Sequence, residues 1–260
     1  MSALTDAVAR RSRKPSAPHT ATIWTIDIER FPMIAYQWSA KNRSGYTPER
    51  MVVEGSRMAS FAALRHDGLV VFASEHHHGR DRMLDTLHRV MDSADILVGY
   101  NSRRFDVKHI NGELATAGYD APSPAKHVDV MQAVKRRFAF DYNSLGSVVQ
   151  RLDVDRKMDA GGFDLWRRCM DGDDAAWEQM KAYNVQDVRA TWALYERIRS
   201  WIPSHPNLAL YVADDRACPV CASTNLTLSG TVAASTRAYA SYRCGDCGSL
   251  SRAKNITART

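Results

Sequence analysis

The feature that most constrains the fold of this chain is an alternating stretch at residues 21–28, which is rich in β-branched residues. Side chains along a strand point to opposite faces in turn, so Trp24 and Ile26 share one face of a predicted strand. Asp27 and the following Glu29 share the other face. The stretch therefore predicts a β-strand with one apolar face and a second face that carries two carboxylates.

The segments that follow predict a mixed α/β domain, because strands come first and strand and helix segments then alternate. Further strands are expected at residues 33–38, 69–73, 96–100 and 128–130. The first two of these are expected to join residues 21–28 in an antiparallel meander. Helical spacing of apolar residues predicts helices at residues 81–91, 105–117 and 175–201. Helix caps are expected at Asp81 for the first helix and at Asp173 or Asp174 for the last.

The chain divides into three predicted parts. Residues 1–19 combine Ser, Pro and Ala with a basic cluster and lack hydrophobic periodicity, which predicts a disordered basic tail. Residues 20–212 are expected to form the main domain, and residues 213–260 a separate cysteine-containing module. The net charge of +6 is concentrated in the two ends, where Lys and Arg outnumber Asp and Glu. Basic ends suit a polyanionic partner, although solvated charge is the commoner explanation.

The composition indicates a soluble, cytoplasmic protein with no membrane partner. No apolar stretch approaches the roughly 18 residues of a membrane helix, and the N-terminus lacks the apolar run of a secretory signal. Four of the five cysteines fall in two C-x-x-C pairs, which favours a metal site in a reducing compartment over a disulfide framework. The fifth, Cys169, is expected to be a small buried residue in a helix.

The two C-x-x-C pairs predict a structural site for one Zn²⁺ ion. The pairs are separated by 22 residues, a spacing typical of Cys₄ sites, and consist of Cys218, Cys221, Cys244 and Cys247. The segments 226–232 and 237–243 between them are expected to form a hairpin, which makes the module a predicted zinc ribbon. A module of under about 50 residues buries too little apolar surface to fold alone, so its metal supplies the missing stability.

Basic and aromatic residues in the predicted ribbon suit nucleic-acid contact. Arg237, Tyr239 and Arg243 alternate with small residues, and such residues contact phosphates and stack on bases. A purely structural cap or a protein-docking surface is the alternative role for the module.

Three acidic stretches in the main domain predict a metal site when they are taken together. The stretches are Asp27-Ile28-Glu29, then residues 101–106 ending in Asp106, then Tyr183 with Asp187 four residues later. Each is common alone, because an Asp near a helix start is usually a cap and Tyr-x-x-x-Asp is an ordinary helix pair. Carboxylates gathered from separate segments repel one another unless cations neutralise them. Hard oxygen ligands of this kind suit Mg²⁺ or Mn²⁺.

With these three motifs in this order, the chain resembles the DEDD exonucleases of the ribonuclease H-like fold, in the subgroup with Tyr in the third motif. The first motif is Ile26-Asp27-Ile28-Glu29, the second runs from Asn101 to Asp106, and the third is Tyr183-Asn184-Val185-Gln186-Asp187. The resemblance covers roughly residues 21–200 and includes Tyr142-Asn143-Ser144-Leu145. It implies a ribonuclease H-like mixed sheet flanked by helices, with the zinc ribbon as an appendage.

The resemblance also implies the chemistry. Asp27, Glu29, Asp106 and Asp187 would hold two Mg²⁺ or Mn²⁺ ions with Asp27 bridging them, and Tyr183 would orient the attacking water. The implied activity is 3′–5′ exonuclease hydrolysis of phosphodiester bonds, with DNA favoured. The implied substrate is a single-stranded 3′ end, and a polymerase or another replication or repair protein is the implied partner.

Other residues near the second motif are expected to border the substrate groove. These candidates are Asn101, Arg103, Arg104 and Phe105. Arg103 and Arg104 either contact phosphate or are simply solvated, and Phe105 is expected to pack against the sheet rather than to stack on a base. Asp129 is expected to cap a helix rather than to act as a fifth ligand. Residues 76–78, three consecutive histidines, are expected in an exposed loop.

Two other functions stay open at this point. One is a non-catalytic nucleic-acid-binding protein or replication-complex adaptor that keeps the nuclease fold. The other is a structure-specific endonuclease. The intact acids and Tyr183 favour catalysis, because binding alone does not need a set of metal ligands.

Overall fold

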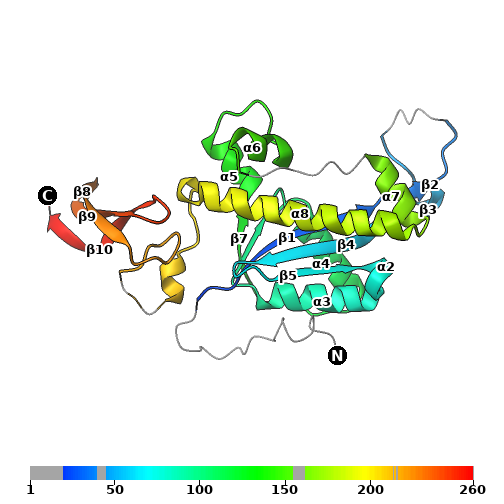
Figure 1. Cartoon of the computed structure of the whole chain (residues 1–260), viewed down its shortest axis with the longest axis horizontal. Coiled ribbons are helices and arrows are strands. Elements are labelled where there is room, and N and C mark those ends of the chain that lie inside the picture. Colours follow the sequence, from blue (N-terminus) through cyan, green and yellow to red (C-terminus); the bar gives the residue numbers. More distant parts are fainter. Residues whose placement is uncertain (1–19, 40–44, 155–161, 213, 215, 260) are drawn as a thin grey trace.

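A five-stranded mixed sheet forms the centre of the computed structural model, which describes residues 20–39, 45–154, 162–212, 214 and 216–259 (Figure 1). The strand order is β5-β4-β1-β6-β7. The strands are β1 (Ile23–Phe31), β4 (Arg57–Arg65), β5 (Val70–Ser74), β6 (Ile96–Gly99) and β7 (Lys126–Asp129). The pairs β1–β4 and β4–β5 are antiparallel, and the pairs β1–β6 and β6–β7 are parallel. The predicted α/β class with a mixed sheet is confirmed. The tail predicted at residues 1–19 lies outside the described residues.

The predicted meander was wrong in its middle strand. Seven of the nine residues of β4 are buried, and this strand pairs with β1 along most of its length. Residues 33–38 contain only the two-residue β2 (Ile34–Ala35), which pairs with β3 (Val52–Glu54) outside the main sheet. The two short strands flank the 3₁₀ turn η1 (Glu49–Met51). Alanine is depleted in strands, so the Ala-rich sequence of β4 gives a weak strand signal although its burial stabilises it there.

Helices cover both faces of the sheet. The helices α3 (Arg80–Ser93) and α4 (Asp106–Thr116) pack on the face that carries Trp24 and Ile26, as the alternation of β1 predicts. On the opposite face lie α5 (Val130–Arg137), α6 (Leu145–Arg151) and the 25-residue α8 (Asp174–Ile198). The shorter α7 (Phe163–Met170) packs on α8 and buries Cys169. The face of β1 with the acids therefore looks toward α8.

The predicted helix caps held for α8 and failed for α3. Asp173 caps α8, because its Oδ1 accepts hydrogen bonds from the backbone N–H groups of Ala175 and Ala176. Gly79, with φ of +77°, occupies the cap position of α3. Asp81 lies inside the first turn of that helix, where a negative charge is favourable next to the positive end of the helix dipole. Helix α8 ends in the 3₁₀ turn η2 (Arg199–Trp201).

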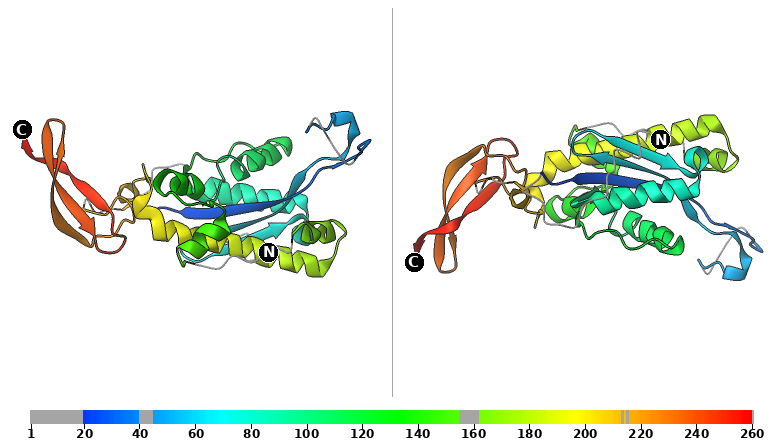
Figure 2. Two further views of the ribbon diagram at one scale, coloured as in Figure 1. Left: turned by 90° about the horizontal axis from the view of Figure 1, so that it is seen from above. Right: turned by 90° about the horizontal axis from the view of Figure 1, so that it is seen from below.

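A second sheet lies beyond the C-terminal end of α8. It has the order β10-β9-β8 and contains β8 (Leu226–Ala234), β9 (Arg237–Cys244) and β10 (Leu250–Arg259). The strands β8 and β9 pair antiparallel, which confirms the predicted hairpin. A short 3₁₀ turn, η3 (Leu208–Tyr211), precedes it. Figure 2 shows this sheet at one end of an elongated molecule and the β2–β3 pair at the other. None of the described helices has the length and apolar character needed to cross a membrane.

Candidate active site

Three carboxylates from two elements meet on the face of β1 that looks toward α8. One oxygen from each of Asp27, Glu29 and Asp187 lies within 4.8 Å of the others. Asp27 and Glu29 share a face because they are two positions apart on a strand. Asp187 is buried and comes from the middle of α8, which crosses that face. Three negative groups this close need compensating positive charge, and oxygen donors of this type suit Mg²⁺ or Mn²⁺.

A buried amide holds one of these carboxylates in place. Asn184, on α8, donates from Nδ2 to Oδ2 of Asp27 at 2.7 Å and lies 3.3 Å from the backbone oxygen of the same residue. Its Oδ1 accepts a hydrogen bond from Oγ of Ser60 on β4. Both Asn184 and Ser60 are fully buried. Sequence reasoning missed this pair, although an Asn at a core position of a helix is a signal that its amide has fixed partners.

The fourth predicted acid, Asp106, lies beside the group of three rather than in it. Its Oδ1 accepts a hydrogen bond of 3.1 Å from the backbone N–H of Ile28, which lies between Asp27 and Glu29 on β1. That N–H is accessible because β6 pairs with β1 only as far as Thr25. Burial raises the pKa of Asp106 to about 6, and the hydrogen bond from Ile28 opposes part of this rise. The side chain is 3% exposed and starts α4, where the sequence places it.

Tyr183 lies one helical turn before Asp187 on α8 and is buried against Trp166 of α7, with ring centroids 6.1 Å apart. Burial raises the pKa of the Tyr183 phenol, and the carboxylates of Asp187 and the β1 acids raise it further. The phenol therefore keeps its proton at neutral pH and offers a hydrogen bond at the edge of the acidic group.

The turn after β6 is shaped by close packing and by one carboxylate. A Cβ added to Gly99 would lie 2.3 Å from Oγ of Ser102, so only glycine fits there. Asn101 follows with φ of +60°, a left-handed conformation that Asn tolerates better than most residues. Asp129 accepts hydrogen bonds from the backbone N–H groups of Asn101 and Arg103. It also caps α5 by accepting from the backbone N–H of Gln132, so the predicted cap is confirmed.

One side chain of the second motif lies differently from expectation. Phe105 does not pack against the sheet, because it is 42% exposed and contacts the ring of His109 on α4 edge-on at 4.6 Å. His109 in turn contacts Arg30, whose guanidinium also donates to the backbone oxygen of Ser56. Arg103 and Arg104 are both exposed, and Arg103 donates to the backbone oxygen of His127 on β7.

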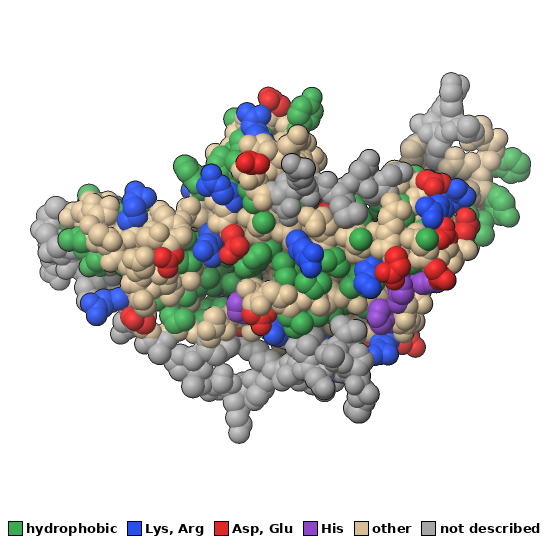
Figure 3. Space-filling model, viewed as in Figure 1, with side chains coloured by type: hydrophobic (Ala, Val, Ile, Leu, Met, Phe, Trp, Pro, Cys, Tyr) green, Lys and Arg blue, Asp and Glu red, His purple; other side chains and the backbone are tan. Residues whose placement is uncertain are grey.

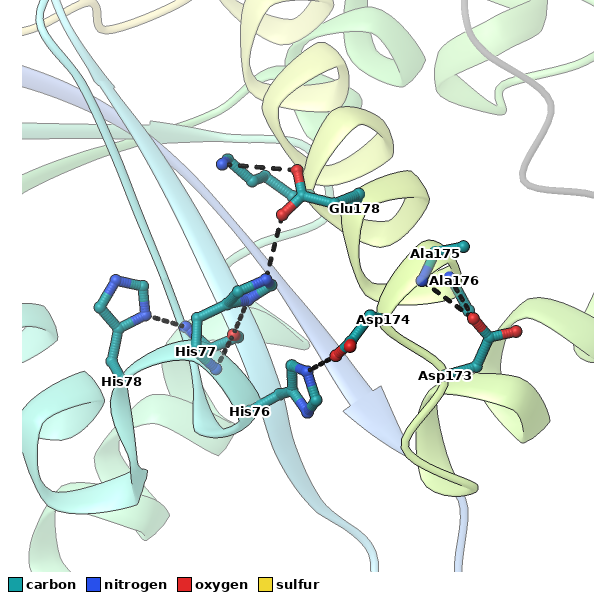
Figure 4. Close-up of polar contacts among 10 residues, drawn as sticks. His76, His77, His78, Asp173, Asp174, Ala175, Ala176 and Glu178 are labelled. Carbon is teal, nitrogen blue, oxygen red and sulfur yellow. Dashed lines mark hydrogen bonds and ion pairs between the residues drawn. The ribbon is translucent and has the colours of Figure 1, made fainter.

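The three consecutive histidines form a short helix and not a loop, which corrects the expectation for residues 76–78. Helix α2 (Glu75–His78) packs against the start of α8, and His76 stacks on Trp177 with ring centroids 5.0 Å apart. The rings of His76 and His77 contact the carboxylates of Asp174 and Glu178 (Figure 4). Figure 3 shows histidine side chains beside acidic ones at this end of the molecule. The contacts join α2 to α8 and lie outside the acidic group.

The four cysteines of the C-terminal module also meet. Their Sγ atoms lie within 4.8 Å of one another, as one Zn²⁺ site requires. The two halves repeat the same backbone pattern. The N–H of Ala222 donates to the oxygen of Cys218, and the N–H of Gly248 donates to the oxygen of Cys244. Ala222 and Gly248 both have positive φ, at 61° and 72°. This repeated turn points both thiol pairs at one centre, which fits a metal ion better than a chance cluster.

Two of the predicted nucleic-acid residues of the module, Tyr239 and Arg243, have side-chain contacts within it. Arg252 lies over the ring of Tyr239 at 4.8 Å from its centroid, and Arg243 donates to the backbone oxygen of Gly248. Arg237 is exposed at the start of β9. These residues are far along the chain from the acidic group, and the structure does not bring them into it.

Comparisons with known proteins agree with this architecture. A family model described as the RNase H superfamily matches residues 58–199, more than half of the chain. No curated protein sequence matches the chain. Among solved structures, a family B DNA polymerase from the hyperthermophilic archaeon Pyrobaculum calidifontis shares the fold, with a TM-score of 0.53 and 16% identity. The match covers 78% of this chain and 28% of the polymerase chain, so this chain spans less than a third of that protein's length.

Proposed function

This chain belongs to the RNase H superfamily, and we propose that it is a 3′–5′ exonuclease of the DEDD type with Tyr in its third motif. It would hydrolyse phosphodiester bonds at the 3′ ends of nucleic acids, with DNA favoured. The observation that carries the proposal is the meeting of Asp27, Glu29 and Asp187 within 4.8 Å, beside the protonated phenol of Tyr183.

Divalent cations are part of the proposal. Asp27, Glu29 and Asp187 would hold Mg²⁺ or Mn²⁺, and Asp106 would complete the set of ligands for two ions. Bound ions of this kind activate a water molecule as nucleophile and stabilise the oxygen that leaves. The carboxylate of Asp106 is raised in pKa by burial, and a nearby cation would favour its ionised form.

The residues of the chain would prepare the site in three ways. Asn184 fixes the orientation of Asp27, because its amide is itself fixed by Ser60. Tyr183 acts as a hydrogen-bond donor and not as a base, because its raised pKa keeps the phenol protonated. The turn at Asn101 is held by Asp129, which keeps the start of α4 and its Asp106 against β1.

Substrate contacts are proposed for residues that are exposed or half-buried. Phe105 of the second motif has a partly exposed ring, on which a base can stack. Such stacking does not depend on the identity of the base. Asn101, Arg103 and Arg104 lie on the same turn and suit contact with the sugar-phosphate backbone. In the C-terminal module, Arg237, Tyr239 and Arg243 are proposed as a second contact region for nucleic acid.

The C-terminal module is proposed to bind one structural Zn²⁺ ion through Cys218, Cys221, Cys244 and Cys247. A polymerase or another replication or repair protein is the proposed partner, a setting that the shared fold of a family B DNA polymerase supports. We also propose a cytoplasmic location, since free cysteines in a metal site suit a reducing compartment.

The proposed activity is tested with a set of nucleic-acid substrates that differ from one another in one property at a time. The purified protein with Mg²⁺ or Mn²⁺ is expected to release mononucleotides from the 3′ end of linear single strands and to leave covalently closed circles intact. Matched DNA and RNA strands, single and paired, define the preferred substrate. Cleavage of circles would make the protein an endonuclease. Tight strand binding without turnover in either ion would identify a binding protein instead.

A further inference from the structure

A cleft of about 390 Å³ runs along the edge strand β7, on the side of the sheet away from β5. One wall is the turn that follows β6, and the other is the segment that follows α8. The floor comes from β7 and α5. Its lining includes Arg103, Arg104, Val128, Ala133, Arg136 and Ile202.

The far wall of the cleft is fixed to the domain rather than loose. Arg137 of α5 donates from Nε to the backbone oxygen of Trp201 at 3.0 Å. The ring of Trp201 also lies 5.8 Å from that of Phe138. Further along, His205 stacks on Tyr195 and shares a 2.8 Å hydrogen bond with its hydroxyl. The cleft is therefore a formed feature with anchored sides.

The charge of the cleft is positive. Arg103, Arg104 and Arg136 line it from two elements. Asp129 supplies the one carboxylate among the described residues of the lining. It accepts hydrogen bonds from three backbone N–H groups, which partly offset its negative charge. Burial lowers the pKa of His127 to about 4, so this side chain is neutral at pH 7 and adds no charge. An anion is thus the favoured occupant.

The lining also contains apolar surface. Val128 and Ala133 are nearly fully buried beneath it, and Ile202 with two prolines forms the wall on the α8 side. The volume is within the range of about 300–1,000 Å³ for pockets that hold small organic ligands. A group with an anionic part and a flatter, less polar part matches such a lining, and a nucleotide has both.

We propose that this cleft is a second nucleotide-binding site, which holds one phosphate-bearing nucleotide away from the acidic group. Arg104 is two residues from Asp106, so the same turn borders both sites. A strand that enters the acidic group would therefore pass the cleft, and the phosphate would lie against Arg104 and Arg136. The identification of the occupant as part of a strand rests on the proposed function, and a free nucleotide shares the same chemistry.

The experiment measures binding without hydrolysis. Fluorescein-labelled dT₁₂ is titrated with the full-length protein in the absence of added Mg²⁺ and Mn²⁺, at several salt concentrations. Arg136→Gln is compared with Lys135→Gln, which removes the same charge from the adjacent exposed position of α5 but is not part of the lining. Arg136→Lys retains the charge. Thermal unfolding of each variant confirms that it is folded.

Arg136→Gln is expected to weaken dT₁₂ binding about tenfold at low salt and to reduce the slope of log K against log salt by about 0.7, the value for one phosphate contact on a single strand. Lys135→Gln and Arg136→Lys should stay within about threefold of the wild type. Equal losses in Arg136→Gln and Lys135→Gln, or no loss in Arg136→Gln, would overturn the proposal.

Competition with dTMP distinguishes the two sources of the nucleotide. Displacement of dT₁₂ by dTMP from the wild type, but not from Arg136→Gln, would assign the cleft to a free nucleotide as well as to a strand. Without such displacement, the cleft holds a nucleotide only as part of a strand. Because the readout is binding, a protein that shows this pattern but hydrolyses nothing would refute the proposed exonuclease and leave the cleft supported.

Discussion

Asn184 on α8 donates a 2.7 Å hydrogen bond to the carboxylate of Asp27 on β1. The amide is fully buried and is oriented on its other side by Ser60. The contact joins the helix that carries Asp187 to the strand that carries the other two acids of the group. The orientation of Asp27 therefore depends on a neutral residue that binds no substrate.

Asn184→Ala is expected to lower turnover by about 10- to 100-fold, the usual loss when a group that orients a metal ligand is removed. The reason is that Asp27 loses its fixed direction while its charge remains. The measurement is the rate of mononucleotide release across a range of Mn²⁺ concentrations. A weakened affinity for the metal raises the Mn²⁺ concentration that is needed for half-maximal rate.

Ser60→Ala is the matched control for that variant. It removes the other hydrogen bond of Asn184 and leaves the contact with Asp27 in place. A smaller loss than in Asn184→Ala is expected. Equal losses in the two variants would show that general disturbance of the core, and not the orientation of Asp27, explains the effect.

Asp106→Asn is expected to stabilise the protein without divalent ions at pH 7 while removing activity. The pKa of Asp106 is raised to about 6, against 3.8 for an unperturbed Asp, so the folded state loses stability as the pH rises from about 4 through 6, and the loss remains at pH 7. Asn keeps an oxygen for the N–H of Ile28 and has no charge to bury. The expected gain is on the order of 1 kcal/mol in the free energy of unfolding.

Thermal unfolding of Asp106→Asn and the wild type between pH 4 and 7 checks the sign. The difference in the free energy of unfolding between the variant and the wild type should shrink as the pH falls toward 4. At that pH the wild-type carboxyl is protonated in the folded state and increasingly in the unfolded state. An advantage that is constant with pH would contradict the raised pKa.

His127 predicts a dependence of opposite sign. Burial lowers its pKa from 6.5 to about 4, so between these values the unfolded state binds a proton that the folded state does not. Stability is therefore present above pH 6.5 and is lost as the pH falls toward 4, with a slope of at most about 1.4 kcal/mol per pH unit. His127→Gln should have a flatter profile in this window. Parallel profiles of stability against pH for the wild type and His127→Gln would contradict the lowered pKa of His127.

In the two turns of the cysteine cluster, replacing Ala by Gly and replacing Gly by Ala should change the affinity for Zn²⁺ in opposite directions. Ala222 and Gly248 occupy equivalent left-handed positions, and a non-glycine residue is strained there by about 1–2 kcal/mol. Ala222→Gly is expected to tighten Zn²⁺ binding about fivefold, and Gly248→Ala to weaken it at least as much.

Competition with a chromogenic chelator measures this affinity in the full-length protein. One Zn²⁺ ion per wild-type chain is expected by elemental analysis, with none in Cys244→Ser. A metal-free wild-type protein, or a weaker site in Ala222→Gly, would contradict the account of the two turns.

The strand β1, its two acids and their common face were predictable from the sequence, because alternation alone decides which side chains share a face. The order of elements likewise predicted the α/β class. The cluster of four cysteines was predictable from the spacing of its two C-x-x-C pairs, because each pair forms a local turn. In each case a short-range pattern determines the structure.

The features that were missed depend on contacts between distant segments. The strand β4 is rich in Ala, and only its place between β1 and β5 makes it a strand. Asn184 gains its role from Asp27, 157 residues earlier in the chain. Helix α2 was mistaken for a loop because its contacts with α8 come from residues about 100 positions away. The cleft beside β7 likewise needs the segment after α8 to form its wall.

The measurement that tests the central claim most directly is the shortening of a 5′-labelled linear strand in Mg²⁺ or Mn²⁺, compared between the wild type, Asp187→Ala and Glu196→Gln. Glu196 is an exposed acid on the same helix, so its variant controls for loss of negative charge from α8. The account predicts stepwise shortening from the 3′ end by the wild type and Glu196→Gln, and a loss of at least about a thousandfold in Asp187→Ala. Full activity in Asp187→Ala, or an intact strand with the wild type in both ions, would contradict it.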